Sequence, residues 1–217
     1  MIHRSILTPT NDCVDTINTL LVNKFPGKEI IYHSSDKTED PNQQSEHEVF
    51  INNLTPNGFS PHVLILKPNC RVILLRNIDP STGLCNGTRL IYRSFEKNVI
   101  DCEIAMGYHC HERVFLPRIP LEPSEIEKLP IAFRRTQFPI RLCFAMTINK
   151  AQGQTLDHVG IYLPQPVFSH GQLYVALSRA KTSASIKILT KPSTESLKED
   201  CTRNVIYHEI LSEATKD

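Results

Sequence analysis

The chain has 217 residues, 40% of them hydrophobic and 22% charged, with a formal net charge of +1. This composition is typical of a globular protein that buries a substantial core. No stretch of about 18 apolar residues predicts a membrane span, and the N-terminal residues lack the apolar segment of a secretory signal. The sequence therefore predicts an intracellular protein that is not secreted and has no membrane partner.

The charge is distributed unevenly along the chain. Residues 1–63 carry four lysines and arginines against eight acidic residues, whereas residues 129–191 carry eight against Asp157 alone. A local excess of positive charge suits a polyanion such as nucleic acid or a nucleotide, although a solvated basic face would have the same composition.

The first part of the chain predicts two strands and a helix. Residues 5–8 and 29–32 are strand candidates, and a helix capped by Thr10 or Asn11 lies between them. Residues 34–61 are polar and interrupted by prolines and a glycine, so they predict a long irregular connection with a helical turn around residues 46–54.

The next part has the pattern of a small antiparallel barrel. Five short apolar runs follow one another, and turn residues separate most of them. The runs are residues 63–66, 71–77, 88–94, 99–106 and 113–116. Four prolines between residues 117 and 130 then predict an extended connection.

Strands and helices alternate again from Ile140 onward. Strands are expected at residues 142–148, 158–163 and 185–189, with a helix over residues 171–180 before the last of them. Such alternation predicts a parallel sheet covered by helices. The fold class is therefore α/β, with one domain built from both ends of the chain and a β-rich insert between them.

The seven cysteines form no CxxC pair, which favours free thiols in a reducing compartment over a disulfide framework. The cluster His109-Cys110-His111, with Cys102 nearby, could suggest zinc. Neighbouring residues in a strand point to opposite faces, however, and no second ligand pair stands at a zinc-site spacing. A solvated hairpin turn explains the cluster better, and we expect no metal site.

Residues 147–155, with the sequence TINKAQGQT, follow a predicted buried strand. A loop at the carboxyl edge of a parallel sheet lies where ligands bind. Thr147, Asn149 and Lys150 can contact a phosphodiester chain, and Gly153 lets the backbone approach a phosphate closely. An ordinary strand–helix loop would have the same spacing, so both interpretations stay open.

Residues 171–180, with the sequence GQLYVALSRA, predict a helix with a small apolar face and one arginine near its end. A guanidinium fixed on a rigid helix can contact a γ-phosphate across a domain interface and stabilise charge in the transition state. Arg179 could equally be a helix-terminal arginine that interacts only with the helix dipole.

Together the two segments resemble motifs V and VI of superfamily 1 helicases. They are most similar to those of the Pif family of 5′-to-3′ DNA helicases, RecD relatives that include the helicases of Helitron transposons. Residues 74–90 resemble the start of that family's SH3-like insert. Residues 138–142 lead into motif V, and residues 163–172 into motif VI, as they do in the family. The resemblance extends from about Arg4 to Leu189.

The resemblance implies a discontinuous second RecA-like domain, with a parallel sheet, formed by residues 1–63 and 139–192. Residues 64–138 would form an inserted SH3-like antiparallel β-barrel. Residues 193–217 would be a C-terminal tail.

The resemblance also implies roles for the residues that match the motifs. Arg179 would be the arginine finger, and Gln152, Gly153 and Gln154 would lie near the nucleotide. The residues expected to contact single-stranded DNA are Thr8 and Thr10 of motif IV, Thr147, Asn149 and Lys150 of motif V, and Ser169 and His170 before motif VI. Relatives often carry histidine at the position of Asn149 and a basic residue at or next to that of Asn11, which puts a second cationic phosphate contact in doubt.

In the family, ATP and Mg²⁺ are bound with a preceding RecA-like domain that carries the P-loop. In the present sequence the only Gly-Lys pair, Gly27-Lys28, is followed by Glu29, and Val22 stands where the first glycine of a P-loop belongs. We therefore expect this chain alone to bind no nucleotide tightly and to be inactive. Its expected partners are single-stranded DNA and the missing N-terminal RecA-like domain.

The family resemblance implies a role in DNA repair, recombination or telomere maintenance, in the nucleus and also in mitochondria. Two alternatives remain open. One is a non-catalytic fragment of a transposon helicase that binds single-stranded DNA or regulates an intact helicase. The other is a peptide adaptor built on the SH3-like insert alone.

Overall fold

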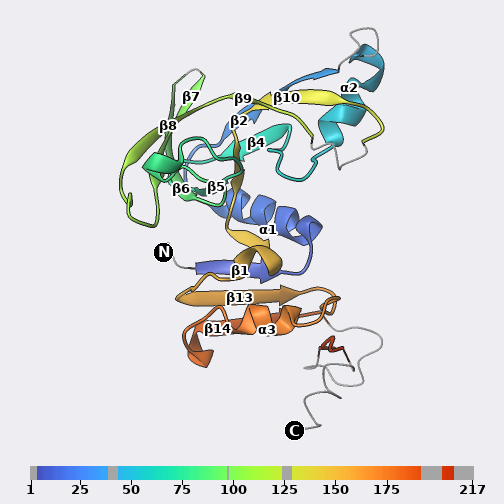
Figure 1. The fold of residues 1–217 in the computed structure, drawn as a ribbon, viewed down its shortest axis with the longest axis vertical. Coiled ribbons are helices and arrows are strands. Elements are labelled where there is room, and N and C mark those ends of the chain that lie inside the picture. Colours follow the sequence, from blue (N-terminus) through green and yellow to red (C-terminus); the bar gives the residue numbers. More distant parts are fainter. Residues whose placement is uncertain (1–3, 39–43, 97, 124–128, 192–201, 208–217) are drawn as a thin grey trace. The chain divides into compact units, whose positions relative to one another are not determined.

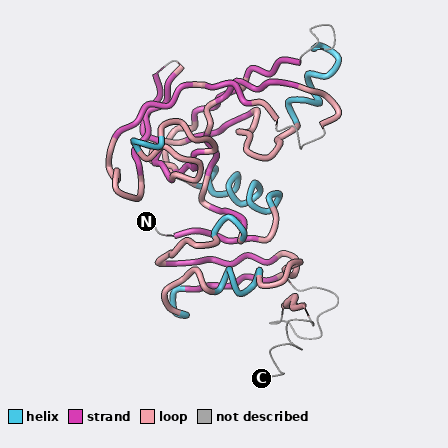
Figure 2. The backbone as a smooth tube through the Cα atoms, viewed as in Figure 1, coloured by secondary structure: helices cyan, strands magenta, loops and turns pink. Residues whose placement is uncertain are grey.

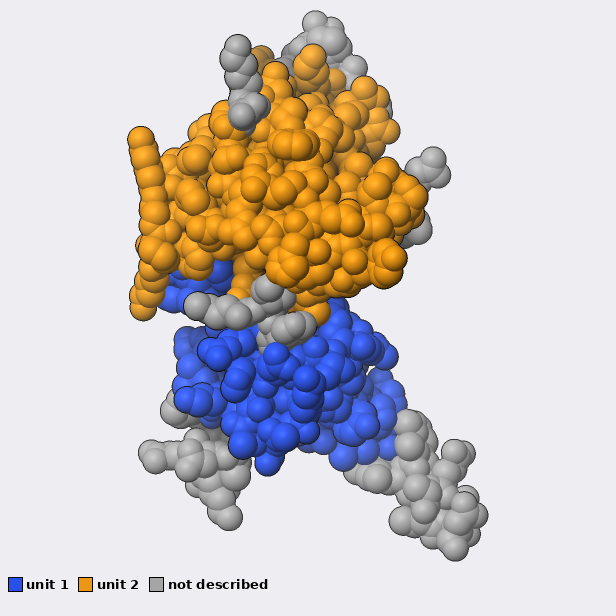
Figure 3. Space-filling view, turned by 90° about the vertical axis from the view of Figure 1, so that its left-hand side faces the viewer, with its two compact units in different colours: residues 1–21, 144–217 blue, residues 22–143 orange. Residues whose placement is uncertain are grey.

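The computed structural model describes residues 4–38, 44–96, 98–123, 129–191 and 202–207. The chain divides into two compact units (Figure 3). Unit 1 comprises residues 1–21 and 144–217, and unit 2 comprises residues 22–143. Within the described ranges, no helix is both long enough and apolar enough to cross a membrane.

Unit 1 is built on a four-stranded sheet with the strand order β12-β1-β13-β14, in which every neighbouring pair is parallel (Figure 1). The strands are β1 (Arg4–Thr8), β12 (Ala145–Thr147), β13 (His158–Leu163) and β14 (Ile186–Thr190). The helical elements are α1 (Asn11–Lys24), whose last residues belong to unit 2, α3 (Gln172–Leu177) and the short 3-10 turns η3 (Asn149–Ala151) and η4 (Ser183–Ser185). The predicted α/β class and parallel sheet are confirmed.

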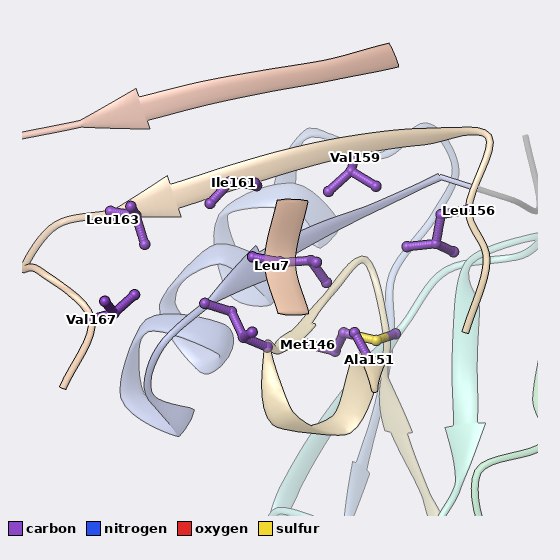
Figure 4. Packing of buried hydrophobic residues seen from close by; sticks show 10 residues of the cluster. Leu7, Met146, Ala151, Leu156, Val159, Ile161, Leu163 and Val167 are labelled. Atoms are coloured by element: carbon purple, nitrogen blue, oxygen red, sulfur yellow. The ribbon is translucent and has the colours of Figure 1, made fainter. Parts of the chain in front are cut away.

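Ten buried apolar residues form the core of unit 1 (Figure 4). Val159, Ile161 and Leu163 come from alternate positions of β13, so they lie on one face of the sheet. Ala176 of α3 is fully buried in the same cluster, and its small side chain lets the helix pack closely. At the outer edge of the sheet, the backbone N–H of Ala145 donates a hydrogen bond of 2.9 Å to the side-chain oxygen of Asn18.

Unit 2 consists mainly of antiparallel strands, which appear in magenta in Figure 2. Its described strands form sheets with the orders β11-β5-β6-β7-β8, β3-β10-β9 and β2-β4. The strands are β2 (Ile30–His33), β3 (Ser35–Thr38), β4 (Val63–Leu66), β5 (Arg71–Leu74), β6 (Arg89–Glu96), β7 (Val99–Ile104), β8 (Arg113–Pro117), β9 (Ile119–Leu121), β10 (Phe133–Gln137) and β11 (Ile140–Leu142). The helix α2 (Gln44–Asn53) and the 3-10 turn η2 (Pro80–Thr82) complete the unit.

The prediction of an irregular connection over residues 34–61 is wrong for β3, whereas the helical turn predicted around residues 46–54 corresponds to α2. The segment contains β3 and α2, and β3 pairs with β10. The reason is a buried ion pair between Arg135 of β10 and Asp36 of β3, with side chains 0% and 3% exposed. A polar strand such as β3 carries no apolar alternation, so its partner strand, not its own sequence, determines its conformation.

Two further strands differ from their predicted partners or limits. The run at 63–66 pairs with β2, and β11 supplies the fifth strand of the larger antiparallel sheet. The strand predicted at residues 142–148 is divided, because β11 pairs with β5 in unit 2 whereas β12 pairs with β1 in unit 1. The compact units change at residues 21–22 and 143–144.

Candidate nucleic-acid and nucleotide site

All the residues predicted to bind DNA or nucleotide belong to unit 1. In the parallel sheet, Thr8 at the end of β1 is the direct neighbour of Thr147 at the end of β12. Because the carboxyl ends of parallel strands meet at one edge, the loops that follow these strands begin there, with Thr10 after β1 and Asn149 after β12. The structure thus brings the predicted motif IV and motif V residues together.

The two threonines are more deeply buried than a direct DNA contact would suggest. Thr8 is fully buried, and its Oγ1 has no hydrogen-bond partner within the described part of the chain. Thr147 is 8% exposed, and its Oγ1 accepts a hydrogen bond from the backbone N–H of Lys150 at 3.4 Å. Asn149 and Lys150 are exposed, so a phosphate can reach these two side chains.

Ser169 and His170 lie in the loop between β13 and α3. The carbonyl oxygen of Ser169 accepts a hydrogen bond from the N–H of Gln172 at 3.3 Å, which begins the helix. The ring of His170 stacks against Tyr207, a residue that belongs to none of the predicted motifs. No pattern in the sequence links these positions, because 36 residues separate them and the contact depends on the path of the chain.

Arg179 is held at the end of α3 by several hydrogen-bond acceptors. Its Nε donates to the carbonyl oxygen of Val175 at 2.9 Å, and its Nη2 donates to Oγ of Ser178 at 2.9 Å. Its Nη1 donates to the carbonyl oxygens of Ala151 at 3.4 Å and Gln154 at 3.1 Å. These bonds use four of the five guanidinium N–H groups and fix the plane of the side chain.

The turn whose carbonyl oxygens accept hydrogen bonds from Arg179 runs through Gly153. Gly153 has a φ of +79°, a left-handed conformation that favours glycine, and a Cβ built there would meet nothing within 4 Å. Gln152 is exposed, whereas the side chain of Gln154 donates a hydrogen bond to the carbonyl oxygen of Lys150 at 3.0 Å. The segments resembling motifs V and VI therefore contact each other directly.

The predicted residues fall into two groups at opposite ends of β13. Thr8, Thr147, Ser169 and His170 lie toward the carboxyl edge of the sheet, whereas Arg179 lies near the amino end of β13. Asn149 and Lys150 lie between the two groups, because the next residue along the loop, Ala151, already contacts Arg179 through its carbonyl oxygen. There the N–H of Leu156 donates to the carbonyl oxygen of Arg179 at 2.8 Å. Figure 4 shows Leu163 and Leu156 at opposite ends of the core. A strand of six residues spans roughly 20 Å, so one ion or ligand group cannot occupy both places.

The cluster at residues 102–111 does not converge on a common point. His109 pairs with Glu112 at 3.0 Å and His111 pairs with Glu103 at 2.9 Å, so each ring faces its own carboxylate. Cys102 is fully buried, and burial raises the pKa of its thiol above the ordinary range. Within the described ranges, no three histidine, cysteine or acidic residues form a group that could hold a metal ion.

Comparison with known proteins identifies relatives. A family model described as the 2B domain of the DNA helicase Pif1 matches residues 49–95. The chain is 31% identical over 163 residues to the ATP-dependent DNA helicase PIF6 of Trypanosoma brucei brucei, covering 72% of the chain and 19% of the relative. It is 35% identical over 130 residues to the human ATP-dependent DNA helicase PIF1, covering 58% of the chain and 19% of the relative. The chain thus spans about a fifth of the length of these curated relatives.

The fold is also found among solved structures. The crystal structure of Bacteroides Pif1 bound to single-stranded DNA superposes with a TM-score of 0.69 at 24% sequence identity. The similarity covers 98% of the present chain and 45% of the Bacteroides chain. Taken with the relatives and the family model, it shows that the chain belongs to the Pif1 helicase family, as the motifs predicted.

Proposed function

We propose that the chain forms the second motor domain of an ATP-dependent 5′-to-3′ DNA helicase. In this proposal residues 1–63 and 139–192 provide the second RecA-like domain, and residues 193–217 form a tail. Residues 64–138 provide an SH3-like insert. The match of residues 49–95 to the 2B domain model and the five-stranded antiparallel sheet of unit 2 support the assignment of the insert.

The contact between Arg179 and the turn through Gly153 is the observation that carries the proposal. The carbonyl oxygens of Ala151 and Gln154 hold the guanidinium in one orientation, although they are 28 and 25 residues away along the chain. A side chain held in this way does not have to be ordered when a phosphate arrives, which favours stabilisation of transition-state charge. We assign Arg179 as the arginine finger and the turn at residues 152–154 to the nucleotide side of the domain.

The carboxyl edge of the sheet is assigned to single-stranded DNA. Asn149 and Lys150 are exposed in the loop after β12 and can contact phosphates, and Ser169 and His170 follow β13, on the other side of β1. Phosphate contacts position a strand without reading its sequence, so this edge suits movement along DNA of any sequence.

ATP and Mg²⁺ need partners that these elements do not supply. Arg179 and the turn can meet the γ-phosphate, whereas cradling the other phosphates and holding Mg²⁺ require a P-loop and a carboxylate. The sequence between residues 1 and 217 contains no P-loop. We therefore assign those groups to a separate RecA-like domain of the motor, and we expect residues 1–217 alone to hydrolyse no ATP.

DNA binding tests the first part of the proposal. Residues 1–217 should bind fluorescently labelled oligo-dT with an affinity that falls as salt rises. Replacing Lys150 with alanine should weaken binding and reduce the slope of log K against log salt by about 1. Lys187→Ala, an exposed lysine on β14, is the matched control and should leave the slope unchanged. Equal slopes for both variants would contradict the assigned edge.

ATP turnover tests the second part. When a P-loop domain is present in the same protein, Arg179→Ala should lower turnover by about 10³-fold or more, with DNA affinity nearly unchanged. A large loss of DNA binding would instead identify Arg179 as a strand contact. DNA-stimulated hydrolysis by residues 1–217 alone, abolished by the same substitution, would contradict the assignment of the P-loop to another domain.

A further inference from the structure

A segment near the end of the chain packs onto the loop before α3. Tyr207 stacks on His170 with the ring centroids 4.8 Å apart and the planes at 12°. The backbone N–H of Tyr207 donates to Nδ1 of His170 at 3.1 Å. Val205 packs against the core of unit 1. Residues 202–207 are thus held to unit 1 by an apolar anchor, a hydrogen bond and a ring contact.

The hydrogen bond from Tyr207 determines which ring nitrogen of His170 carries a proton. Because Nδ1 accepts the hydrogen bond from the backbone N–H, the ring proton lies on Nε2. His170 therefore offers an N–H donor on the side opposite to Tyr207's backbone. A phosphate oxygen is a suitable acceptor for such a donor.

The stack leaves an aromatic face available. Tyr207 is 53% exposed although one face of its ring lies on His170. A nearly parallel pair of rings can accept a third flat ring on its open face, and an unpaired nucleobase presents such a π-face whatever its identity. Phe168, two residues before His170, is 62% exposed and adds a second ring to the same loop.

We propose that Tyr207, stacked on His170, forms a binding site for an unpaired nucleobase of single-stranded DNA. The inference rests on the proposed function, because His170 lies at the carboxyl edge assigned to DNA. It adds a stacking contact to a surface so far defined by phosphate contacts. The ligand class is an unpaired base, with no preference among the four.

A competing explanation is that Tyr207 occupies the place of a base and excludes DNA from His170. The packing of Val205 argues against it, because displacing the segment would expose more of an apolar side chain that is now partly buried against the core cluster. The anchor makes residues 202–207 a fixed part of the surface. If Tyr207 excluded DNA, removing its ring would strengthen DNA binding, whereas a stacking site predicts that binding weakens. One experiment therefore separates the two explanations.

The test measures binding of residues 1–217 to oligo-dT and to an abasic oligonucleotide of the same length. Tyr207→Ala, Tyr207→Leu and Tyr207→Phe all keep the backbone N–H that bonds His170, and only Tyr207→Phe keeps the aromatic ring. We expect the first two to weaken oligo-dT binding about fivefold or more and the third to match the unchanged chain. Affinity for the abasic strand should stay the same in all three, since it has no bases to stack.

A fluorescent base and a second tyrosine sharpen the result. An oligonucleotide with one 2-aminopurine should be quenched on binding by the unchanged chain and much less by Tyr207→Leu, which retains an apolar side chain. Tyr174→Ala removes another highly exposed tyrosine and should have no effect. Unchanged or tighter binding by Tyr207→Ala would overturn the inference alone. Failure of the unchanged chain to bind any oligonucleotide would overturn the proposed function, and the inference with it.

Discussion

Replacing Arg135 with methionine should strongly destabilise unit 2. The side chain is fully buried and donates to both carboxylate oxygens of Asp36, with the shortest contact at 2.6 Å. It also donates to the carbonyl oxygens of Ile51, Leu54 and Ser60 at 2.9 to 3.1 Å. Methionine retains most of the volume but leaves a buried carboxylate and three buried carbonyl groups without this donor.

The size of the effect follows from these contacts. Removing one partner of a buried ion pair costs about 3–5 kcal/mol, a large share of a total stability of about 5–15 kcal/mol. With a urea dependence of about 2 kcal/mol per molar, a loss of about 4 kcal/mol lowers the unfolding midpoint by about 2 M. The midpoint is measured by circular dichroism, and hydrogen exchange of β3, α2 and β10 shows whether the loss begins there.

A neighbouring arginine provides the control for this prediction. Arg134 lies on the same strand and pairs with Glu122 at 2.5 Å, but both side chains are 60% exposed. Exposed pairs contribute about 0–1 kcal/mol, so Arg134→Met should move the midpoint by less than about 0.5 M. Equal midpoints for the two variants would refute the reasoning, because burial is the main difference between them.

Two further predictions concern pH and backbone conformation. Burial lowers the pKa of His62 from 6.5, and the nearby Arg135 lowers it further, although Asp36 partly offsets both. His62 then binds a proton more readily in the unfolded chain than in the folded one. Its contribution to the free energy of unfolding is therefore fully present above about pH 6.5 and is lost as the pH falls below that value. The urea midpoints measured at about pH 7.5 and pH 5 should differ less for His62→Asn than for the unchanged chain. The same difference in both proteins would contradict this prediction. Gly153→Ala should lower the free energy of unfolding by about 1–2 kcal/mol, because φ is +79° and the space around the site is open, so the cost comes from the backbone conformation. Hydrogen exchange of the amides around Gln154 should accelerate. Unaltered exchange would show that the left-handed conformation of Gly153 does not constrain this turn.

The sequence predicted the parallel sheet well because its elements carry their own patterns. Apolar alternation marks β13, and a capping residue and apolar periodicity mark α1. The family resemblance implied that Arg179 and the residues around Gly153 lie near the same nucleotide, and the hydrogen bonds between the Arg179 guanidinium and this turn agree with their being neighbours. The catalytic and DNA-binding roles of these residues remain predictions.

Elements that depend on a distant partner could not be read from the sequence. The strand β3 has the polar sequence SDKT and exists because β10 pairs with it and Arg135 neutralises Asp36. The division of residues 140–147 between two units likewise depends on which strand each half meets, β5 or β1. Tyr207 belongs to the same class, since its position is determined by the packing of Val205 and by His170.

The helix α3 connects the two groups of site residues. It begins just after His170 at the carboxyl edge and ends just before Arg179, whose guanidinium contacts the turn through Gly153. Its fully buried Ala176 packs against the core, which resists bending of so short an element. If DNA is bound at one end and a γ-phosphate at the other, a shift of α3 moves both contacts together. The proposed helicase function would require this property, because each ATP cycle would have to alter the grip on the strand, and we propose that one packed helix between the two motifs provides it.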